Sequence, residues 1–89
     1  MRAALVTGAS AGIGAATAEA LQGAGYRVAA NYGARTDLAQ AFAARTGIPA
    51  FAWNVADPAA CRDGVARVEA EIGLIEVLVN NAGITRDAM

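Results

Sequence analysis

The chain has 89 residues, of which 56% are hydrophobic and 17% charged, and its formal net charge is −1. This length allows at most one small domain, and the scattered, nearly balanced charges argue against a nucleic-acid surface or a basic membrane patch. No apolar run approaches the ~20 residues that cross a bilayer, so we expect a cytoplasmic protein with no membrane partner. The single cysteine, Cys61, has no metal-ligand cluster beside it and is predicted to be a small core residue.

Short apolar runs alternate with helical stretches along the chain, a pattern typical of a parallel α/β sheet. We expect strands at residues 3–6, 28–32, 50–55 and 77–79. With right-handed crossovers, this βαβαβαβ pattern predicts part of a doubly wound Rossmann sheet with strand order 3-2-1-4. The first and fourth strands then lie side by side, and their carboxyl ends open onto the crevice where such sheets bind ligands.

The first two helices are predicted from apolar spacing and from the residues at their ends. The first ends at Gly25, and its predicted buried face consists of Ile13, Ala16, Thr17, Ala20, Leu21 and Ala24. The second is expected over residues 38–45, with Thr36 or Asp37 as its N-cap and Gly47 past its end. Its predicted buried side chains are Leu38, Ala41 and Phe42.

The third helix has the clearest start signal. Asp57-Pro58 is typical of an N-cap followed by a proline in the first helical position. Gly73 is expected to end the helix. Its predicted apolar face consists of Cys61, Val65, Val68 and Ile72.

The turn between the first strand and the first helix has the sequence Thr7-Gly8-Ala9-Ser10-Ala11-Gly12-Ile13-Gly14. Gly8 allows a sharp exit from the strand, Gly12 lets the backbone approach a pyrophosphate, and Gly14 lets the helix pack closely on the strand. Because backbone N–H groups at a helix N-terminus bind phosphate, this pattern between a strand and a helix predicts dinucleotide binding. The alternative is a tight turn that binds no ligand.

The end of the second strand bears on which dinucleotide is bound. An acid about 20 residues beyond the glycine loop binds the ribose 2′-OH of NAD, whereas a nearby Arg accommodates the 2′-phosphate of NADP. Asn31 and Tyr32 occupy this region without an acid, and the turn residue Gly33 and then Arg35 follow. A guanidinium can bind phosphate through two hydrogen bonds, so the sequence favours NADP(H). The alternative is that Arg35 is a solvated loop cation and Asp37 only caps a helix.

Amide side chains end the third and fourth expected strands. Asn54 could offer its amide to the edge of an adenine, or it could simply be a polar strand terminus. Asn80 and Asn81 are expected to be two buried amides that tie strands together, and Ala82-Gly83 leaves room for a ribose.

The motif Thr-Gly-x-x-x-Gly-Ile-Gly at residues 7–14, together with Asn-Asn-Ala-Gly at residues 80–83, resembles the short-chain dehydrogenase/reductase family, and the spacing of the two motifs also fits. The resemblance covers all 89 residues, but only the N-terminal part of the family's fold. Residues 53–57, 68–71 and 77–89 are similar to the acetoacetyl-CoA reductases of polyhydroxybutyrate synthesis. The 3-oxoacyl-ACP reductases share the Asn-Asn-Ala-Gly-Ile-Thr-Arg-Asp segment, so that segment alone does not separate the two groups.

This resemblance implies a set of site residues. The family's glycine-loop role falls on Gly8, Ser10, Ala11, Gly12, Ile13 and Gly14. Its adenine contact falls on Asn54 and Val55, and its nicotinamide-ribose side falls on Asn81, Ala82, Gly83, Ile84 and Thr85. The loop toward an acyl-thioester substrate includes Asp87. Many NADP-preferring members carry a basic residue where this chain has Ala11, so the preference for NADP(H) rests mainly on Arg35.

The resemblance also implies an activity, the NADPH-dependent reduction of acetoacetyl-CoA to the 3-hydroxyacyl thioester by a homotetramer. The family's proton donor is a Tyr four residues before a Lys, and this chain has no Lys. We therefore expect the N-terminal piece of a longer reductase, which carries no catalytic residue and is inactive alone. The alternatives are a 3-oxoacyl-ACP reductase or another member of the family, and a non-catalytic dinucleotide-binding module.

Overall fold

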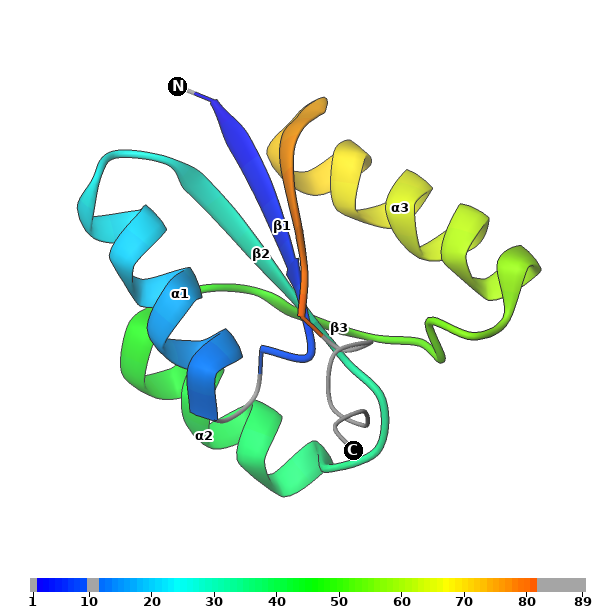
Figure 1. The fold of residues 1–89 in the computed structure, drawn as a ribbon, viewed down its shortest axis with the longest axis horizontal. Coiled ribbons are helices and arrows are strands. Elements are labelled where there is room, and N and C mark those ends of the chain that lie inside the picture. Colours follow the sequence, from blue (N-terminus) through cyan, green and yellow to red (C-terminus); the bar gives the residue numbers. More distant parts are fainter. Residues whose placement is uncertain (1, 10–11, 82–89) are drawn as a thin grey trace.

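The computed structural model describes residues 2–9 and 12–81. Its elements are β1 (Ala3–Thr7), α1 (Gly12–Gly23), β2 (Arg27–Tyr32), α2 (Thr36–Thr46), β3 (Ala50–Ala52), α3 (Pro58–Ile72) and β4 (Ile75–Asn80). The strands form one parallel sheet in the order β3-β2-β1-β4. Helices α1 and α2 cover one face of the sheet and α3 covers the other (Figure 1). The predicted alternation of strands and helices and the predicted strand order are both confirmed.

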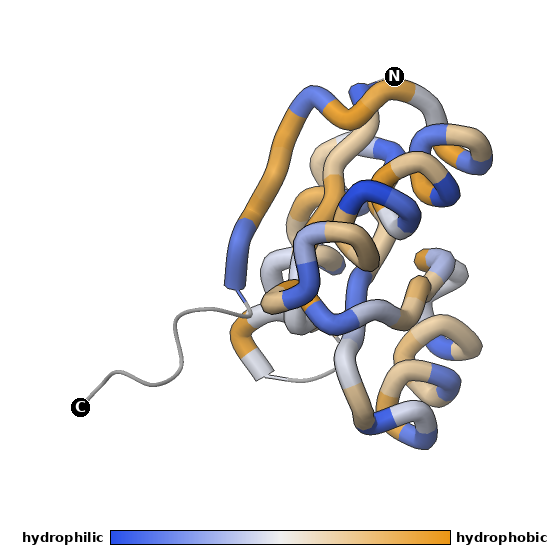
Figure 2. Tube along the Cα trace, turned by 90° about the vertical axis from the view of Figure 1, so that its right-hand side faces the viewer, coloured by the Kyte–Doolittle hydropathy of each residue, from blue (hydrophilic) through white to orange (hydrophobic). Residues whose placement is uncertain are grey.

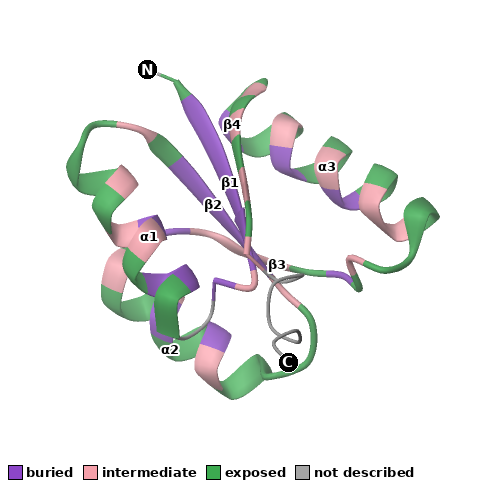
Figure 3. Ribbon diagram, viewed as in Figure 1, coloured by how far each residue is buried: buried purple, intermediate pink, exposed green. Residues whose placement is uncertain are grey.

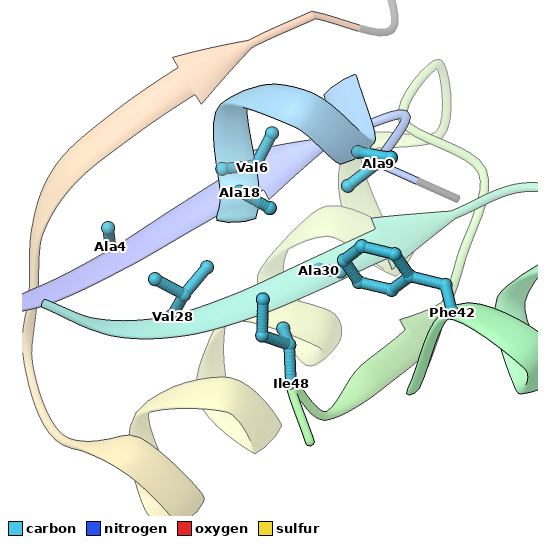
Figure 4. Close-up of a cluster of buried hydrophobic side chains, with 9 residues drawn as sticks. Ala4, Val6, Ala9, Ala18, Val28, Ala30, Phe42 and Ile48 are labelled. Carbon is cyan, nitrogen blue, oxygen red and sulfur yellow. The ribbon is translucent and has the colours of Figure 1, made fainter. Parts of the chain in front are cut away.

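Alternate side chains of the central strands point to opposite faces of the sheet and build two cores. The core under α1 and α2 contains Ala4, Val6, Ala9, Ala15, Ala18, Val28, Ala30, Phe42 and Ile48 (Figure 4). The core under α3 contains Ala3, Leu5, Ala29, Trp53, Val68 and Ile72. Strand β1 is buried along its whole length (Figure 3). Burial on both faces explains why β1 and most of β2 consist of continuous apolar residues.

Helix α1 packs on the sheet through a different face from the one predicted. Its buried residues are Gly14, Ala15 and Ala18, with Leu21 half-buried beside them. Ile13 is 78% exposed, and Ala16, Ala20 and Ala24 are exposed as well. Alanines on nearly every side of the helix leave its rotational phase open in the sequence. The contact of Gly14 with the turn after β1 fixes that phase, because only a residue without a Cβ fits there.

Helix α2 begins two residues earlier than predicted, at Thr36. Its N-cap is Arg35, which makes no capping hydrogen bond through its side chain, so the predicted caps Thr36 and Asp37 are wrong. Ala39 and Phe42 form the buried face, whereas Leu38 is half-buried and Ala41 is exposed. Gly47 ends the helix in the left-handed conformation with φ 77°, as predicted.

Strand β3 ends at Ala52 instead of the predicted residue 55. The N–H of Trp53 still donates to Tyr32 O at 3.1 Å, but the chain then turns away from the sheet. The Asn54 side chain makes this turn by accepting from the N–H of Ala56 at 2.9 Å, and the N–H of Asp57 donates to Asn54 O. Asn54 therefore competes with the ladder by bonding its own backbone neighbours.

Helix α3 starts as the sequence predicts. The Asp57 carboxylate accepts from the N–H groups of Ala59 and Ala60 at 3.0 and 3.2 Å. On the predicted apolar face, Val68 and Ile72 are buried, and Cys61 and Val65 are half-buried. The Cys61 thiol donates to Val55 O at 3.3 Å, so it packs as a partly buried structural residue.

Strand β4 is longer than predicted and lies at one edge of the described sheet. Figure 2 shows the apolar run of β4 between polar residues near its two ends. Leu78 is 61% exposed on this strand, and Leu74, just before it, is 75% exposed. None of the helices in residues 2–9 and 12–81 is both long enough and apolar enough to span a membrane.

Candidate functional site

The turn after β1 has the backbone conformation that its glycines allow. Gly8 and Gly12 have φ values of 63° and 62°, in the left-handed region that glycine adopts without strain. A Cβ on Gly14 would overlap the carbonyl oxygen of Gly8 and lie 2.7 Å from Asn81 Nδ2. A Cβ on Gly12 would meet no atom within 4 Å. The roles predicted for Gly8 and Gly14 as the sharp exit and the close contact are therefore confirmed.

Strand β4 is tied to the same turn by amide side chains. Asn81 Nδ2 donates to Gly8 O at 3.2 Å, and Thr7 Oγ1 donates to Asn80 Oδ1 at 3.1 Å. The predicted linking role of the two amides is confirmed, but their predicted burial is wrong, since Asn80 is exposed and Asn81 is half-buried. The carboxyl ends of β1 and β4 thus meet at one place, where the winding of the sheet reverses. The other predicted site residues of this region lie outside the described residues: Ser10, Ala11, Ala82, Gly83, Ile84, Thr85 and Asp87.

A cavity of about 350 Å³ lies at the carboxyl ends of β1, β2 and β3. Its described lining consists of Gly8, Asn31, Gly33, Ala34, Trp53, Asn54 and Val55. Four of these were predicted as site residues from the sequence: Gly8, Gly33, Asn54 and Val55. No carboxylate is among the lining residues that the structure describes. The cavity therefore adjoins the glycine turn and carries no fixed negative charge of its own from these residues.

Asn31 lines the cavity, although it is not among the site residues predicted from the sequence. Its side chain is almost fully buried, with 1% of the residue exposed. Its Nδ2 donates to Trp53 O at 3.0 Å, and its Oδ1 accepts from the N–H of Gly8 at a longer 3.4 Å. The amide thereby links the ends of all three strands that border the cavity. The signal was present, because a buried amide within an apolar central strand must find partners.

Trp53 also lines a second cavity, on the α3 side. The residue is 8% exposed and lines both, the second cavity having a volume of about 440 Å³. A Cβ on Gly64 of α3 would overlap two indole ring atoms and lie 2.8 Å from a third, Cε2. Because Gly64 has no side chain, the Trp53 ring can pack directly against α3 at this position. The buried Trp53 Nε1 has no hydrogen-bond partner among the described residues.

Arg35 lies on the surface directly after the cavity residues Gly33 and Ala34. Its Nε and Nη2 donate to the two carboxylate oxygens of Asp37 at 3.3 and 3.2 Å. The side chains of this pair are 65% and 71% exposed. The hydrogen bond from Arg35 lowers the pKa of Asp37, and a backbone hydrogen bond from Leu38 lowers it further. In turn, the hydrogen bond to Asp37 raises the pKa of Arg35. Both groups are thus charged at neutral pH.

The described residues of this region offer backbone N–H groups, amide side chains and apolar surface to a ligand. Within the described ranges, no group of three or more His, Cys, Asp or Glu side chains could hold a metal ion. The turn offers backbone N–H groups near the start of α1, where the helix dipole favours an anion. The adjoining cavity offers amide and indole groups with apolar surface. A ligand with a phosphate part and an aromatic part matches both.

The chain is similar to a known protein family and to several known reductases. A family model described as short chain dehydrogenase matches residues 2–89. The chain is 62% identical over 86 residues to an acetoacetyl-CoA reductase of Paracoccus denitrificans, covering 97% of this chain and 36% of that protein. It is 59% identical over 88 residues to an acetoacetyl-CoA reductase of Rhizobium meliloti (strain 1021), covering 99% of this chain and 36% of the relative. The chain thus spans about a third of the length of these curated relatives.

Other relatives and solved structures extend the similarity. The chain is 44% identical over 91 residues to a 3-oxoacyl-(acyl-carrier-protein) reductase of Staphylococcus aureus (strain Mu50 / ATCC 700699), covering 97% of this chain and 37% of that protein. A short-chain dehydrogenase/reductase from Serratia marcescens BCRC 10948 superposes with a TM-score of 0.79 at 36% identity, over 90% of this chain and 35% of the other. The structure of BdcA in complex with NADPH superposes with a TM-score of 0.74 at 36% identity, over 93% of this chain and 32% of the other. On the strength of the family match along almost its whole length, the chain belongs to the short-chain dehydrogenase family.

Proposed function

We propose that this chain binds NADP(H) as the N-terminal, cofactor-holding part of a longer reductase. The observations that carry the proposal are the positive φ values of Gly8 and Gly12, the close contact of Gly14 with the Gly8 carbonyl, and the cavity of about 350 Å³ that Gly8 lines. Backbone N–H groups of that turn would hold the pyrophosphate at the start of α1. Gly33, Asn54 and Val55 would border the adenosine.

The residues present fit such a dinucleotide. The space at Gly12 is open, with no atom within 4 Å of a Cβ built there, so the backbone can be approached closely. The described cavity lining has no carboxylate to repel a 2′-phosphate, and Arg35 follows two of its residues in sequence. The NADPH complex of the structural neighbour BdcA also supports this assignment. When bound, the nicotinamide supplies a hydride to a carbonyl carbon.

For the substrate we propose a 3-oxoacyl thioester, acetoacetyl-CoA first. Support comes from the acetoacetyl-CoA reductases that are about 60% identical over this part of their length. The 44% identical relative is named for an acyl-carrier-protein substrate, so reduction of a 3-oxoacyl-ACP is the second candidate. In the full-length protein, consumption of NADPH with acetoacetyl-CoA and with acetoacetyl-ACP should be compared. A kcat/KM at least tenfold higher for the CoA thioester is expected, and no turnover of either would contradict the proposal.

The exchange Arg35→Ala tests the cofactor assignment. We expect the KM for NADPH to rise by roughly tenfold, because a charge-assisted hydrogen bond to the 2′-phosphate is lost. The KM for NADH, which has no such phosphate, should change by less than about twofold. Arg62→Ala on the exposed side of α3 is a matched control and should change neither value. Steady-state kinetics with both cofactors give the answer, and an unchanged ratio of the two KM values would refute a phosphate-binding role for Arg35.

A further inference from the structure

We propose that Asp37 limits the preference for NADPH by competing with the 2′-phosphate for the guanidinium of Arg35. The inference rests on the proposed function, since it concerns the same phosphate. It assigns to Asp37 a role in cofactor specificity in addition to its place as an acidic residue in the first turn of α2.

The Asp37 carboxylate occupies an edge of the guanidinium through which Arg35 would bind a phosphate. Asp37 occupies both Nε and Nη2 of Arg35, at 3.3 and 3.2 Å, so one edge of the guanidinium fork is taken. Phosphate is recognised by Arg through the same two-point contact. A 2′-phosphate must therefore displace Asp37 or use the remaining N–H groups with the carboxylate close by. In either case the negative charge of Asp37 opposes the negative charge of the phosphate.

Capping of α2 does not account for this arrangement. The N-cap position belongs to Arg35, whose backbone O accepts from the N–H of Ala39 at 3.0 Å. Asp37 lies inside the first turn, where its carboxylate reaches back to the guanidinium. An Asn at this position keeps the size of the side chain and an oxygen for the Leu38 N–H, but it replaces the second oxygen with an NH2 donor and removes a charge that the N-terminus of α2 favours. Asp37→Asn therefore tests the competition for Arg35, and a parallel unfolding measurement reports any loss of helix support.

The experiment measures NADPH and NADH dissociation constants of the full-length protein and of Asp37→Asn at low and high salt. We expect NADPH to bind roughly two- to fivefold more tightly to the variant at low salt, in line with the modest strength of an exposed ion pair. NADH binding should stay within about 1.5-fold of wild type. The gain for NADPH should shrink at about 1 M salt, where the Debye length falls to roughly 3 Å.

Two controls make the result specific. Glu19→Gln removes a carboxylate that pairs with Arg45 at 3.0 Å, an exposed ion pair away from the cavity lining, and should leave both cofactors unaffected. In the Arg35→Ala background, Asp37→Asn should give a smaller improvement than in wild type, because only direct repulsion of the phosphate is left to relieve and no guanidinium is released. Thermal unfolding of each variant verifies that α2 remains folded.

The outcomes distinguish this inference from the proposed function. If Arg35→Ala leaves the NADPH-to-NADH ratio unchanged, the phosphate-binding role itself is wrong. If Arg35→Ala weakens NADPH while Asp37→Asn has no effect, or weakens NADPH because Asp37 orients Arg35, the competition is refuted and the phosphate-binding role stands. Equal tightening of NADPH and NADH would also refute it, since only NADPH carries the 2′-phosphate.

Discussion

Replacing Gly14 by alanine is expected to lower the free energy of unfolding by about 3 kcal/mol and to abolish detectable binding of NADPH. The new Cβ would overlap Gly8 O, which belongs to the backbone and cannot rotate away, and would press on Asn81 Nδ2 and Gly8 C at 2.7 and 2.9 Å. Relief requires α1 to move away from β1, and this movement would open the turn that is proposed to hold the pyrophosphate. Urea unfolding and NADPH titration of the full-length protein measure the two effects.

The matched control for this exchange is Gly23→Ala, at the other end of the same helix. A Cβ there meets nothing within 4 Å, and the residue is exposed. Because alanine is the better helix former, stability should stay the same or rise by up to about 0.5 kcal/mol. NADPH binding should be unaffected. A Gly14→Ala protein that is as stable as wild type and binds NADPH equally well would show that the contact between α1 and the turn is not essential.

Replacing Asn31 by aspartate is the second change with a large expected effect, a loss of about 2–4 kcal/mol at pH 8. The exchange removes the Nδ2 donor to Trp53 O and sets a carboxylate oxygen against that carbonyl in a site that is 1% exposed. Burial raises the pKa of the new carboxyl above the value of about 3.9 that it has in the unfolded chain. The folded state then binds more protons than the unfolded state, so stability falls as pH rises through the folded pKa.

Urea unfolding at pH 5 and pH 8 checks this prediction. Asn31→Asp should be more stable at pH 5, relative to wild type, than at pH 8. Asn31→Leu removes the same hydrogen bonds without adding a charge, and its loss of about 2 kcal/mol should not depend on pH in this way. Asn54→Asp is the exposed control, with an expected change within about 0.5 kcal/mol. Similar stabilities of Asn31→Asp at both pH values would argue against a buried, strand-linking amide at this position.

Local signals in the sequence were sufficient for the order of elements, the strand order and the residues that end most helices. Asp57-Pro58 starts α3 through hydrogen bonds within its own first turn, and Gly47 and Gly73 end helices through their own backbone conformation. These features depend on residues that are near neighbours in the chain. The glycine turn was predictable for the same reason, since the strand before it and the helix after it are both visible in the sequence.

Features that depend on distant contacts were predicted less well. The phase of α1 follows from the contact of Gly14 with Gly8 O, and alanines on all sides of the helix gave no indication of it. The start of α2 was misplaced for a local reason: Arg35 takes the N-cap position without a side-chain capping bond, and the carboxylate of Asp37 pairs with Arg35 two residues away. The fit of the Trp53 ring against Gly64 joins residues from two elements, and periodicity within either element does not reveal it.

In the candidate site too, some residues were predictable from local sequence and others were not. Gly8, Gly33, Asn54 and Val55 were predicted and lie together around the cavity. Asn31 was missed because it was considered only as a strand end without an acid. Trp53 was missed because it was considered only as part of a strand and of a segment similar to acetoacetyl-CoA reductases. A buried amide in an apolar strand is the physical signal that identifies Asn31, since such a group must be hydrogen-bonded.

A crystal structure of the full-length protein with NADPH tests the central claim most directly. We predict that the pyrophosphate lies on the backbone N–H groups of the turn between β1 and α1, with the adenine in the cavity lined by Gly33, Asn54 and Val55. The 2′-phosphate should lie within hydrogen-bond distance of the Arg35 guanidinium. A pyrophosphate bound away from this turn, or an adenine outside this cavity, would contradict the assignment of the site.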